Sequence, residues 1–135
     1  MRHRRERRLG KAVALSADGG ETFGPPAMQP ALRGPVCQSS LASVPPSAAA
    51  PTGSLLFSGP DSSDARASLV VRRSRDGGGA WDVPALSIDP GAAAYSALAA
   101  PLPLARGCDG GAPCGGVLYE AAGTVIRFTR FPLAF

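Results

Sequence analysis

The sequence predicts an all-β chain of antiparallel strands, and two observations carry this prediction. An eight-residue pattern, Ser-x-Asp-x-Gly-x-x-aromatic, occurs twice, as Ser16–Phe23 and as Ser74–Trp81. The rest of the chain consists of strand-sized apolar runs separated by Gly, Pro, Ser and Asp, without a convincing helical pattern. Both features are typical of strands that follow one another through tight turns.

Each copy of the eight-residue pattern predicts a β-hairpin, because a short apolar run, Ala12–Leu15 or Ala67–Val71, precedes it. The Asp of each copy can fold its carboxylate back onto the amides of the turn. The glycines that follow permit the positive φ angles that tight hairpins need. We expect the final aromatic residue to begin the return strand and to bury its ring beside it. The defining residues are Ser16, Asp18, Gly20 and Phe23 in one copy and Ser74, Asp76, Gly78 and Trp81 in the other.

The other strands are predicted in chain order from their apolar runs. After a first hairpin over residues 11–24, the predicted strands are Val36–Val44, Gly53–Ser58, Arg66–Arg75, Trp81–Ile88, Tyr95–Leu104, Gly116–Ala121 and Thr124–Leu133. The predicted connections are an irregular link over residues 25–35, the loops Pro45–Pro51 and Gly59–Ala65, a link over Asp89–Ala94 and a turn over Cys108–Cys114.

The chain has 135 residues and a net charge of +4, and its basic residues are concentrated at the start. Residues 1–10 are expected to be a basic, disordered leader, and residues 11–135 a single small domain. A nucleic-acid or anionic-membrane tail is an alternative for the leader, and a start foreign to the ancestral domain is the interpretation we favour. Without the leader the chain is near neutral, which argues against a nucleic-acid-binding face. No apolar run is long enough to span a membrane, and no signal peptide is recognisable.

The cysteines and the histidine limit the chemistry. Cys108 and Cys114 could close a small loop as a disulfide or remain two thiols in a surface turn, and the sequence leaves both open. Cys37 is expected to be a small buried residue. The one histidine, His3, lies in the leader, so the sequence offers no Ser-His-Asp triad and no His-rich metal site.

Further motifs lie between and after the two hairpins in a definite order. The chain contains Cys-Gln-x-Ser at Cys37–Ser40, Leu-Leu-Phe-Ser at Leu55–Ser58, Tyr-Ser-x-Leu at Tyr95–Leu98 and Leu-Tyr-Glu at Leu118–Glu120. With the eight-residue patterns, which resemble Asp boxes, this order resembles the C-terminal third of an exo-α-sialidase (neuraminidase) from Lys11 to Phe135. The resemblance implies part of a six-bladed β-propeller, which we expect to consist of about two antiparallel four-stranded blades.

The chemistry of sialic acid explains the residues that this family uses. The anomeric carbon carries a carboxylate that repels a carboxylate nucleophile, and sialidases use a Tyr nucleophile instead. In the family a Glu deprotonates that Tyr, an Asp is the general acid and base, and three arginines clamp the substrate carboxylate with their forked donors. The first arginine, the Asp and the Glu lie further N-terminal in the family, and this chain has no residues that match them.

The resemblance assigns four positions of this chain. Tyr95 matches the nucleophile, Arg66 the third clamp arginine, and Glu120 the glutamate that orients the first arginine. Lys11 stands at the second clamp position, where lysine keeps the charge and loses the forked geometry. Packing is the alternative for Tyr95, and solvated loop positions are the alternatives for Arg66 and Glu120. Three further arginines, Arg72, Arg73 and Arg75, are expected to be surface charges on the blade.

These assignments predict a glycosidase that removes terminal α-linked sialic acids from glycoproteins, gangliosides or oligosaccharides in its complete form. A sialylated glycoconjugate is the expected substrate or ligand, and no cofactor is implied. We expect the 135-residue chain to be inactive alone. One alternative is a non-catalytic Asp-box module that binds a glycan or a protein. Another is a product that does not fold by itself. The compartment is left open.

The length of the chain has a consequence for assembly. A four-stranded blade takes roughly 40–50 residues, so the chain holds about two blades and some additional strands. A propeller typically closes with at least about four blades. The chain is therefore expected to be part of a larger ring or to associate with other copies through unpaired blade edges.

Overall fold

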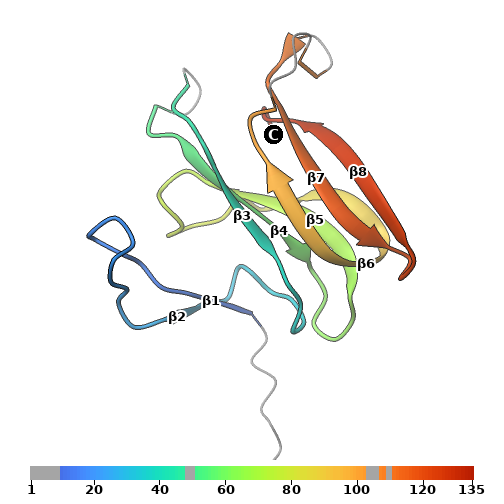
Figure 1. Ribbon diagram of the computed structural model, residues 1–135, viewed down its shortest axis with the longest axis horizontal. Coiled ribbons are helices and arrows are strands. Elements are labelled where there is room, and N and C mark those ends of the chain that lie inside the picture. The colour runs from blue at the N-terminus through green and yellow to red at the C-terminus, as the bar shows by residue number, and fades with distance from the viewer. Residues whose placement is uncertain (1–9, 48–50, 103–106, 109–110) are drawn as a thin grey trace, which may run out of the picture.

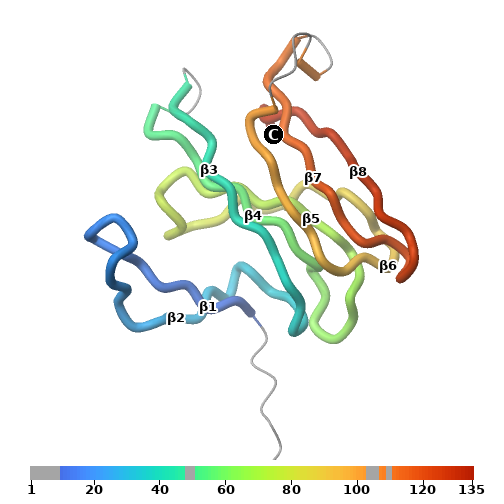
Figure 2. Tube along the Cα trace, in the orientation of Figure 1, coloured from blue at the N-terminus to red at the C-terminus, as the bar shows by residue number. Residues whose placement is uncertain are grey.

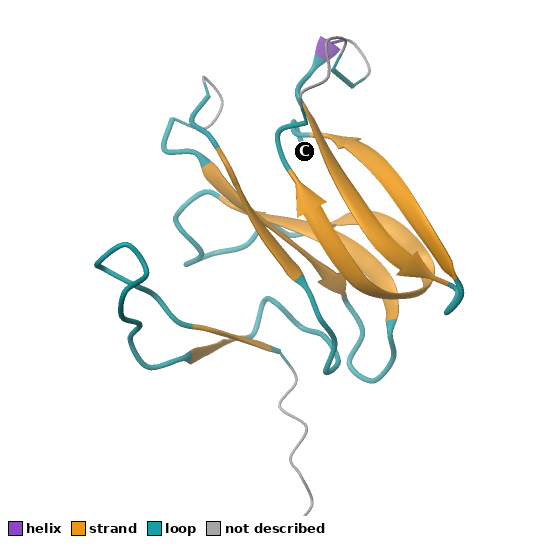
Figure 3. Ribbon diagram, in the orientation of Figure 1, coloured by secondary structure: helices purple, strands orange, loops and turns teal. Residues whose placement is uncertain are grey.

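The computed structural model describes residues 10–47, 51–102, 107–108 and 111–135, which form eight β-strands (Figures 1 and 3). The predicted leader lies almost wholly outside these residues. All strand pairs are antiparallel, which confirms the all-β prediction. In the described part of the chain, no helix is long and apolar enough to cross a membrane. The strands are β1 Lys11–Val13, β2 Ala27–Gln29, β3 Ser40–Val44, β4 Ser54–Pro60, β5 Ala67–Ser74, β6 Leu86–Ala99, β7 Cys114–Ala121 and β8 Val125–Pro132.

The strands make a small hairpin, β1–β2, and a six-stranded sheet in the order β3-β4-β5-β6-β7-β8. The long strand β6 belongs to two parts of this sheet. Its first half pairs with β5 and its second half, from Ala93 on, pairs with β7. The strand curves strongly between the two halves (Figure 2). The sheet thereby divides into a four-stranded blade, β3 to the first half of β6, and a three-stranded blade, the second half of β6 to β8.

The prediction of a link at Asp89–Ala94 is wrong, because β6 runs through these residues without interruption. Leu69 of β5 pairs with Asp89 and Ala67 pairs with Ala92, so a register shift places Pro90 and Gly91 outside the regular ladder. A β-bulge of this kind bends a strand and leaves a residue unpaired. The Pro-Gly sequence therefore marks a bend between two blades and not the end of a strand.

Two other boundaries differ from the prediction. The link predicted over residues 25–35 contains β2, which pairs with β1 in the register Lys11↔Gln29 and Val13↔Ala27. The strand predicted from Trp81 begins only at Leu86. Pro84 lies in between, and its ring nitrogen has no hydrogen to donate to a ladder. The hairpin loops are therefore longer than the two patterns alone predict.

Two apolar clusters hold the four-stranded blade between its neighbours. The smaller cluster joins the β1–β2 hairpin to the blade through Leu32, Phe57 and Trp81, and the rings of Phe57 and Trp81 meet edge to face at 6.1 Å. The larger cluster fills the space between the two blades. Its members are Leu56, Leu69, Val71, Ala93, Val117, Tyr119, Ala121, Phe131 and Leu133.

The two Asp boxes have nearly the same internal hydrogen bonds. The Ser16 and Ser74 hydroxyls each accept a bond from the amide of the second glycine, both at 2.8 Å. Asp18 accepts a bond from the Thr22 amide at 3.0 Å, and Asp76 accepts one from the Ala80 amide at 2.9 Å. Gly19 and Gly20 of the first turn and Gly77 and Gly78 of the second turn have positive φ angles. These contacts confirm the predicted fold-back of the carboxylates.

The two Asp boxes differ in their aromatic residues. Trp81 is 8% exposed and packs on Phe57, whereas Phe23 is 64% exposed. The prediction of a buried ring is therefore right for Trp81 and wrong for Phe23. The first hairpin lies at one end of the array of strands, with the four-stranded blade on one side of it (Figure 1). Phe23 is not covered by this blade.

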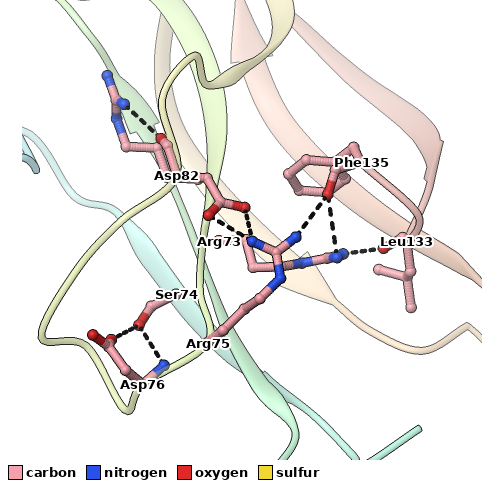
Figure 4. A network of polar contacts seen from close by, with 8 residues as sticks. Arg73, Ser74, Arg75, Asp76, Asp82, Leu133 and Phe135 are labelled. Atoms are coloured by element: carbon pink, nitrogen blue, oxygen red, sulfur yellow. Dashed lines mark hydrogen bonds and ion pairs between the residues drawn. The ribbon is translucent and has the colours of Figure 1, made fainter. Parts of the chain in front are cut away.

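The three arginines of β5 and its turn are not all surface charges. Arg72 and Arg73 are buried, and only Arg75 is exposed. Arg73 donates to the carbonyls of Leu133 and Phe135, and its guanidinium lies 4.5 Å from the centre of the Phe135 ring (Figure 4). The carbonyl acceptors follow Arg73 by some 60 positions. The arginine thus joins β5 to the segment that follows β8.

The cysteine alternatives are also decided by the structure. Cys108 and Cys114 form a disulfide, so the small loop is closed. Cys37 is a free thiol and is half-buried, which is less than the predicted burial.

Candidate functional site

The positions that the sequence singled out come together where β5, β6 and β7 meet the segment before β3. Arg66 immediately precedes β5, Tyr95 lies in the second half of β6, and Glu120 lies on β7. The Ala93 amide donates to the Arg66 carbonyl at 2.9 Å, which holds the mouth of β5 against the bend of β6. The bend in β6 thereby brings Arg66 and Tyr95 to the same place.

Arg66 and Tyr95 are in direct contact. The guanidinium carbon of Arg66 lies 5.2 Å from the centre of the Tyr95 ring, within the range of a cation–π interaction. Both side chains are exposed, and Tyr95 has 45% of its surface free. The phenol of Tyr95 and the guanidinium of Arg66 therefore both lie at a surface that a ligand can reach.

Glu120 lies beside this pair. Its Oε2 accepts a bond from the Tyr95 amide at 3.4 Å, so the carboxylate is next to the backbone of the predicted nucleophile. Tyr95 and Glu120 border a shallow hollow of about 200 Å³, lined by Gln38, Tyr95–Ala97, Leu118–Glu120 and Ile126. The hollow offers one carboxylate and several apolar side chains close to the phenol.

Lys11 reaches the same region from the hairpin. Its Nζ donates to the carbonyls of Pro35 at 3.3 Å and Cys37 at 2.6 Å, and Arg66 Nη2 donates to the Val36 carbonyl at 3.4 Å. Three successive carbonyls thus bind the two predicted clamp cations. Partial burial lowers the pKa of the Lys11 ammonium. In this structure the ammonium is held by the carbonyls of Pro35 and Cys37.

Cys37 is a member of this region that sequence reasoning did not place here. Burial raises the pKa of its thiol, while the charges of Arg66 and Lys11 act in the opposite direction. The thiol is therefore protonated at neutral pH and is a poor nucleophile. Its position in the Cys-Gln-x-Ser motif was the only sequence signal that could have indicated its place.

Gln38 and Ser40 fix the second half of β6, another role that the sequence did not reveal. The Ser96 amide donates to Gln38 Oε1 and the Leu98 amide to Ser40 Oγ, both at 3.0 Å. The hydroxyls of Ser58 and Ser96 also bond to each other at 2.8 Å. These side chains join β3, the segment before it and β4 to the second half of β6 without a backbone ladder, and they hold the strand that carries Tyr95.

The arrangement suits the recognition of a small anion. The Arg66 guanidinium offers forked donors that match a carboxylate, and the Tyr95 phenol lies against it. Among the described residues, no group of three or more His, Cys, Asp or Glu could hold a metal ion. The groups gathered here are one guanidinium, one ammonium, one phenol and one carboxylate.

The chain is similar in sequence to the sialidase of Micromonospora viridifaciens, a curated protein. The two are 38% identical over 130 residues, which are 93% of this chain and 18% of the sialidase. The chain therefore spans about a fifth of the length of this relative. No protein-family model matches the chain.

Solved structures give the same result for the fold. The Hadza microbial sialidase Hz136 superposes with a TM-score of 0.69 and 30% identity over 93% of this chain and 23% of its own. The intramolecular trans-sialidase of Ruminococcus gnavus, solved with oseltamivir carboxylate, has a TM-score of 0.66 at 23% identity, covering 90% of this chain and 28% of its own. The leech intramolecular trans-sialidase, solved with 2,7-anhydro-Neu5Ac, has a TM-score of 0.67 at 20% identity, covering 93% and 20%.

The two trans-sialidases are similar to this chain in fold alone, whereas the Micromonospora viridifaciens sialidase and Hz136 are similar to it in sequence as well. They agree with the Asp boxes, the antiparallel blades and the order of the motifs. In sequence and in fold, this chain is a relative of the sialidases that corresponds to one part of their β-propeller.

Proposed function

We propose that the chain is the C-terminal part of a sialidase-type glycoside hydrolase that removes terminal α-linked sialic acids from glycoproteins, gangliosides or oligosaccharides. The observation that carries this proposal is the contact of the Arg66 guanidinium with the Tyr95 ring, beside the Glu120 carboxylate. This is the pairing that a Tyr nucleophile and a carboxylate clamp require, because the anomeric carbon and the carboxylate of sialic acid are adjacent atoms.

In this proposal each group has one task. The Tyr95 oxygen attacks the anomeric carbon and forms a covalent glycosyl intermediate, which water then hydrolyses with retention of configuration. Arg66 holds the substrate carboxylate with two parallel donors. Lys11 adds a second positive charge without the fork. Glu120 orients an arginine that the family supplies from further upstream.

The chain alone is proposed to be inactive. The acid/base Asp, the Glu that deprotonates the Tyr and the first clamp arginine have no matching residues in this sequence. A general acid and a base each contribute about 10²–10⁴-fold to rates of this kind. Without them, no base takes the proton of the Tyr95 phenol, and the leaving group receives no proton.

A chimera tests this function directly. The part of the Micromonospora viridifaciens sialidase that precedes the matched stretch is joined to residues 11–135, and hydrolysis of a fluorogenic sialoside is measured. We expect turnover by the chimera and none by the 135-residue chain. The Tyr95→Phe chimera loses turnover, whereas the Val83→Ser chimera retains it, because Val83 is exposed in the loop between β5 and β6. A folded chimera without turnover contradicts the proposal.

A second function is favoured by the bonds of Lys11. Its ammonium is already bound by two carbonyls, which suits a non-catalytic Asp-box module that binds a glycan or a protein. In that case Tyr95→Phe leaves the affinity of the chain for a sialylated glycan almost unchanged, and the chimera binds sialosides without hydrolysing them. Calorimetric titration with sialyllactose separates the two functions.

A further inference from the structure

Tyr95 lies at an interruption of the ladder between β6 and β7. The register shifts between Ala93 and Ser96, each of which has a partner on β7. Two residues of β6, Ala94 and Tyr95, thus face one residue of β7, Glu120, which is the arrangement of a β-bulge. The Tyr95 amide donates to the Glu120 carboxylate at 3.4 Å. The regular ladder therefore fixes the residues on either side of the bulge and not Tyr95 itself.

The residues that flank the bulge are both bonded to residues outside the three-stranded blade. On one side, the Ala93 amide donates to the Arg66 carbonyl at 2.9 Å. On the other side, the Ser96 amide donates to Gln38 Oε1 at 3.0 Å. The Ser96 hydroxyl bonds to the hydroxyl of Ser58 at 2.8 Å. The position of the bulge therefore depends on what holds its two neighbours.

Ser58 holds Ser96 from the strand β4. Both side chains are buried, with exposed fractions of 0% for Ser58 and 3% for Ser96. The Ser96 hydroxyl also donates to the Ser58 carbonyl at 3.4 Å, so β4 contacts this serine through a side chain and through the backbone. Because successive side chains of a strand point to opposite faces, the burial of Ser96 accompanies the exposure of Tyr95.

The bond between Ser58 and Ser96 fixes a direction that apolar packing leaves open. The hydrophobic effect that joins the two blades is non-directional, whereas a hydrogen bond has a defined distance and angle. Tyr95 is the next residue in the chain, so a displacement of Ser96 displaces Tyr95 as well. The Arg66 guanidinium lies 5.2 Å from the centre of the Tyr95 ring, and this contact changes with any such displacement.

From this geometry we propose that Ser58 is a positioning residue, which fixes Tyr95 against Arg66 by holding Ser96. Its effect on catalysis rests on the proposed function, in which the Tyr95 oxygen attacks the carbon that carries the carboxylate bound by Arg66. A misplacement of about 1 Å in such an arrangement can cost about 10²-fold in rate. The Ser58 hydroxyl is buried and acts through Ser96, so its removal slows the reaction and leaves substrate binding in place.

Fluorine NMR of the 135-residue chain, with 3-fluorotyrosine in place of tyrosine, tests the position of Tyr95 without catalysis. The chain has two tyrosines, and Tyr119→Phe assigns their signals. Arg66→Ala gives the signal that Tyr95 has without the cation beside its ring. We expect Ser58→Ala to move the Tyr95 signal toward that position. Ser54→Ala, which truncates a buried serine at the other end of β4, is the matched control and leaves the signal in place. An unchanged Tyr95 signal in folded Ser58→Ala overturns the proposal.

A double variant separates positioning from a purely structural role. Ser58→Ala leaves the buried Ser96 hydroxyl without its shorter bond, which by itself costs stability. Ser58→Ala combined with Ser96→Ala removes both hydroxyls, so urea unfolding should show recovered stability while the Tyr95 signal stays displaced. Recovery of the signal together with the stability overturns the proposal. If Ser58→Ala does not fold, the double variant decides the test.

Steady-state kinetics of the same variants in the chimera test the effect on the reaction. We expect Ser58→Ala to lower kcat about tenfold or more and to change KM less than about twofold. The Ser54→Ala chimera should have the parent values. A Ser58→Ala chimera with the parent kcat, or one that loses substrate affinity alone, overturns the proposal. A parent chimera without turnover contradicts the proposed function instead, and the fluorine signal then decides whether Ser58 positions Tyr95.

Discussion

Lys11 is the residue at which this chain departs most clearly from a three-arginine clamp. Its ammonium is held by the carbonyls of Pro35 and Cys37, and Arg66 reaches the carbonyl between them. A lysine binds a carboxylate as a point charge, whereas an arginine binds it through two parallel hydrogen bonds. In the proposed enzyme, we therefore expect the residue at this position to control how firmly the substrate carboxylate is held.

Replacing Lys11 by Arg in the chimera should strengthen substrate binding. One additional charge-assisted bond corresponds to about 1.4 kcal/mol of binding free energy, which lowers KM about tenfold. Steady-state kinetics with the fluorogenic sialoside measure this change. The matched control is Arg75→Lys, which exchanges the same two residue types at an exposed site paired with Asp82. An unchanged KM in the Lys11→Arg chimera would show that the position does not contact the carboxylate.

Asp89 is a second residue with a defined role, since it fixes the bend of β6. Its Oδ1 accepts a bond from the Gly91 amide at 2.8 Å, and its Oδ2 accepts bonds from Tyr119 and Arg127, both at 3.1 Å. The bond from the Gly91 amide is the main cause that lowers the pKa of this carboxyl below its usual value. The charged form therefore stabilises the folded chain.

The free energy of unfolding at acidic pH should depend on the Asp89 carboxyl. Because the folded pKa is lowered, the unfolded chain takes up the proton first, and the stabilisation is lost as pH falls below about 4. Urea unfolding at a series of pH values should show Asp89→Asn destabilised by about 2 kcal/mol at neutral pH with a shallower acid slope. Asp64→Asn, in an exposed loop, is the control. Equal acid slopes for Asp89→Asn and the parent would contradict this role.

At the scale of elements, the two Asp boxes have the same turn and different surroundings. The bonds from the glycine amide to the serine and from the backbone amide to the aspartate agree to within about 0.1 Å between the copies, because they depend on residues within one short segment. The aromatic residues differ because their burial depends on what packs against the hairpin. Trp81 has Phe57 beside it, and Phe23 is largely exposed.

Truncating the two aromatic residues should therefore have unequal effects. Trp81→Ala is expected to lower the free energy of unfolding by about 3–5 kcal/mol, and Phe23→Ala to change it by less than about 0.5 kcal/mol. Urea unfolding at a dilution where the chain is monomeric measures both. Similar losses for the two variants would mean that the first hairpin packs as the second one does.

Elements that depend on local residues could be predicted from the sequence, and those that depend on distant partners could not. The two hairpins and the last strand pair follow from local patterns. Strand β6 does not, since the bend at Pro90 and Gly91 is compatible with a strand only when β5 supplies a register shift. Arg73 is buried because carbonyls about 60 residues later cover it. The sequence motifs predicted Arg66, Tyr95 and Glu120 as site residues. Only the structure showed that Cys37 and Gln38 lie in the same region.

At the scale of the whole molecule, the order of packing predicts where the chain is most stable. The four-stranded blade is buried on both faces, while the hairpin and the three-stranded blade each have one open face. Stability in such an array is greatest in the middle and lowest at its ends.

Native-state hydrogen exchange should reveal this order. The amides of Leu69–Val71 on β5, whose side chains are buried, should exchange most slowly, and those of β1 and β2 fastest. Protection that is absent around Leu69–Val71 would indicate a chain that does not fold by itself. Uniform protection from β1 to β8 would contradict the proposed gradient.

The central claim is that Tyr95 is the nucleophile of a sialidase of which this chain is one part. The most direct measurement is to incubate the chimera with a slow fluorinated sialoside and to identify the modified peptide by mass spectrometry. The account predicts a covalent sialyl adduct on the phenol of Tyr95, formed at the same rate as turnover is lost. An adduct on another residue, or a Tyr95→Phe chimera that retains full turnover, would contradict it.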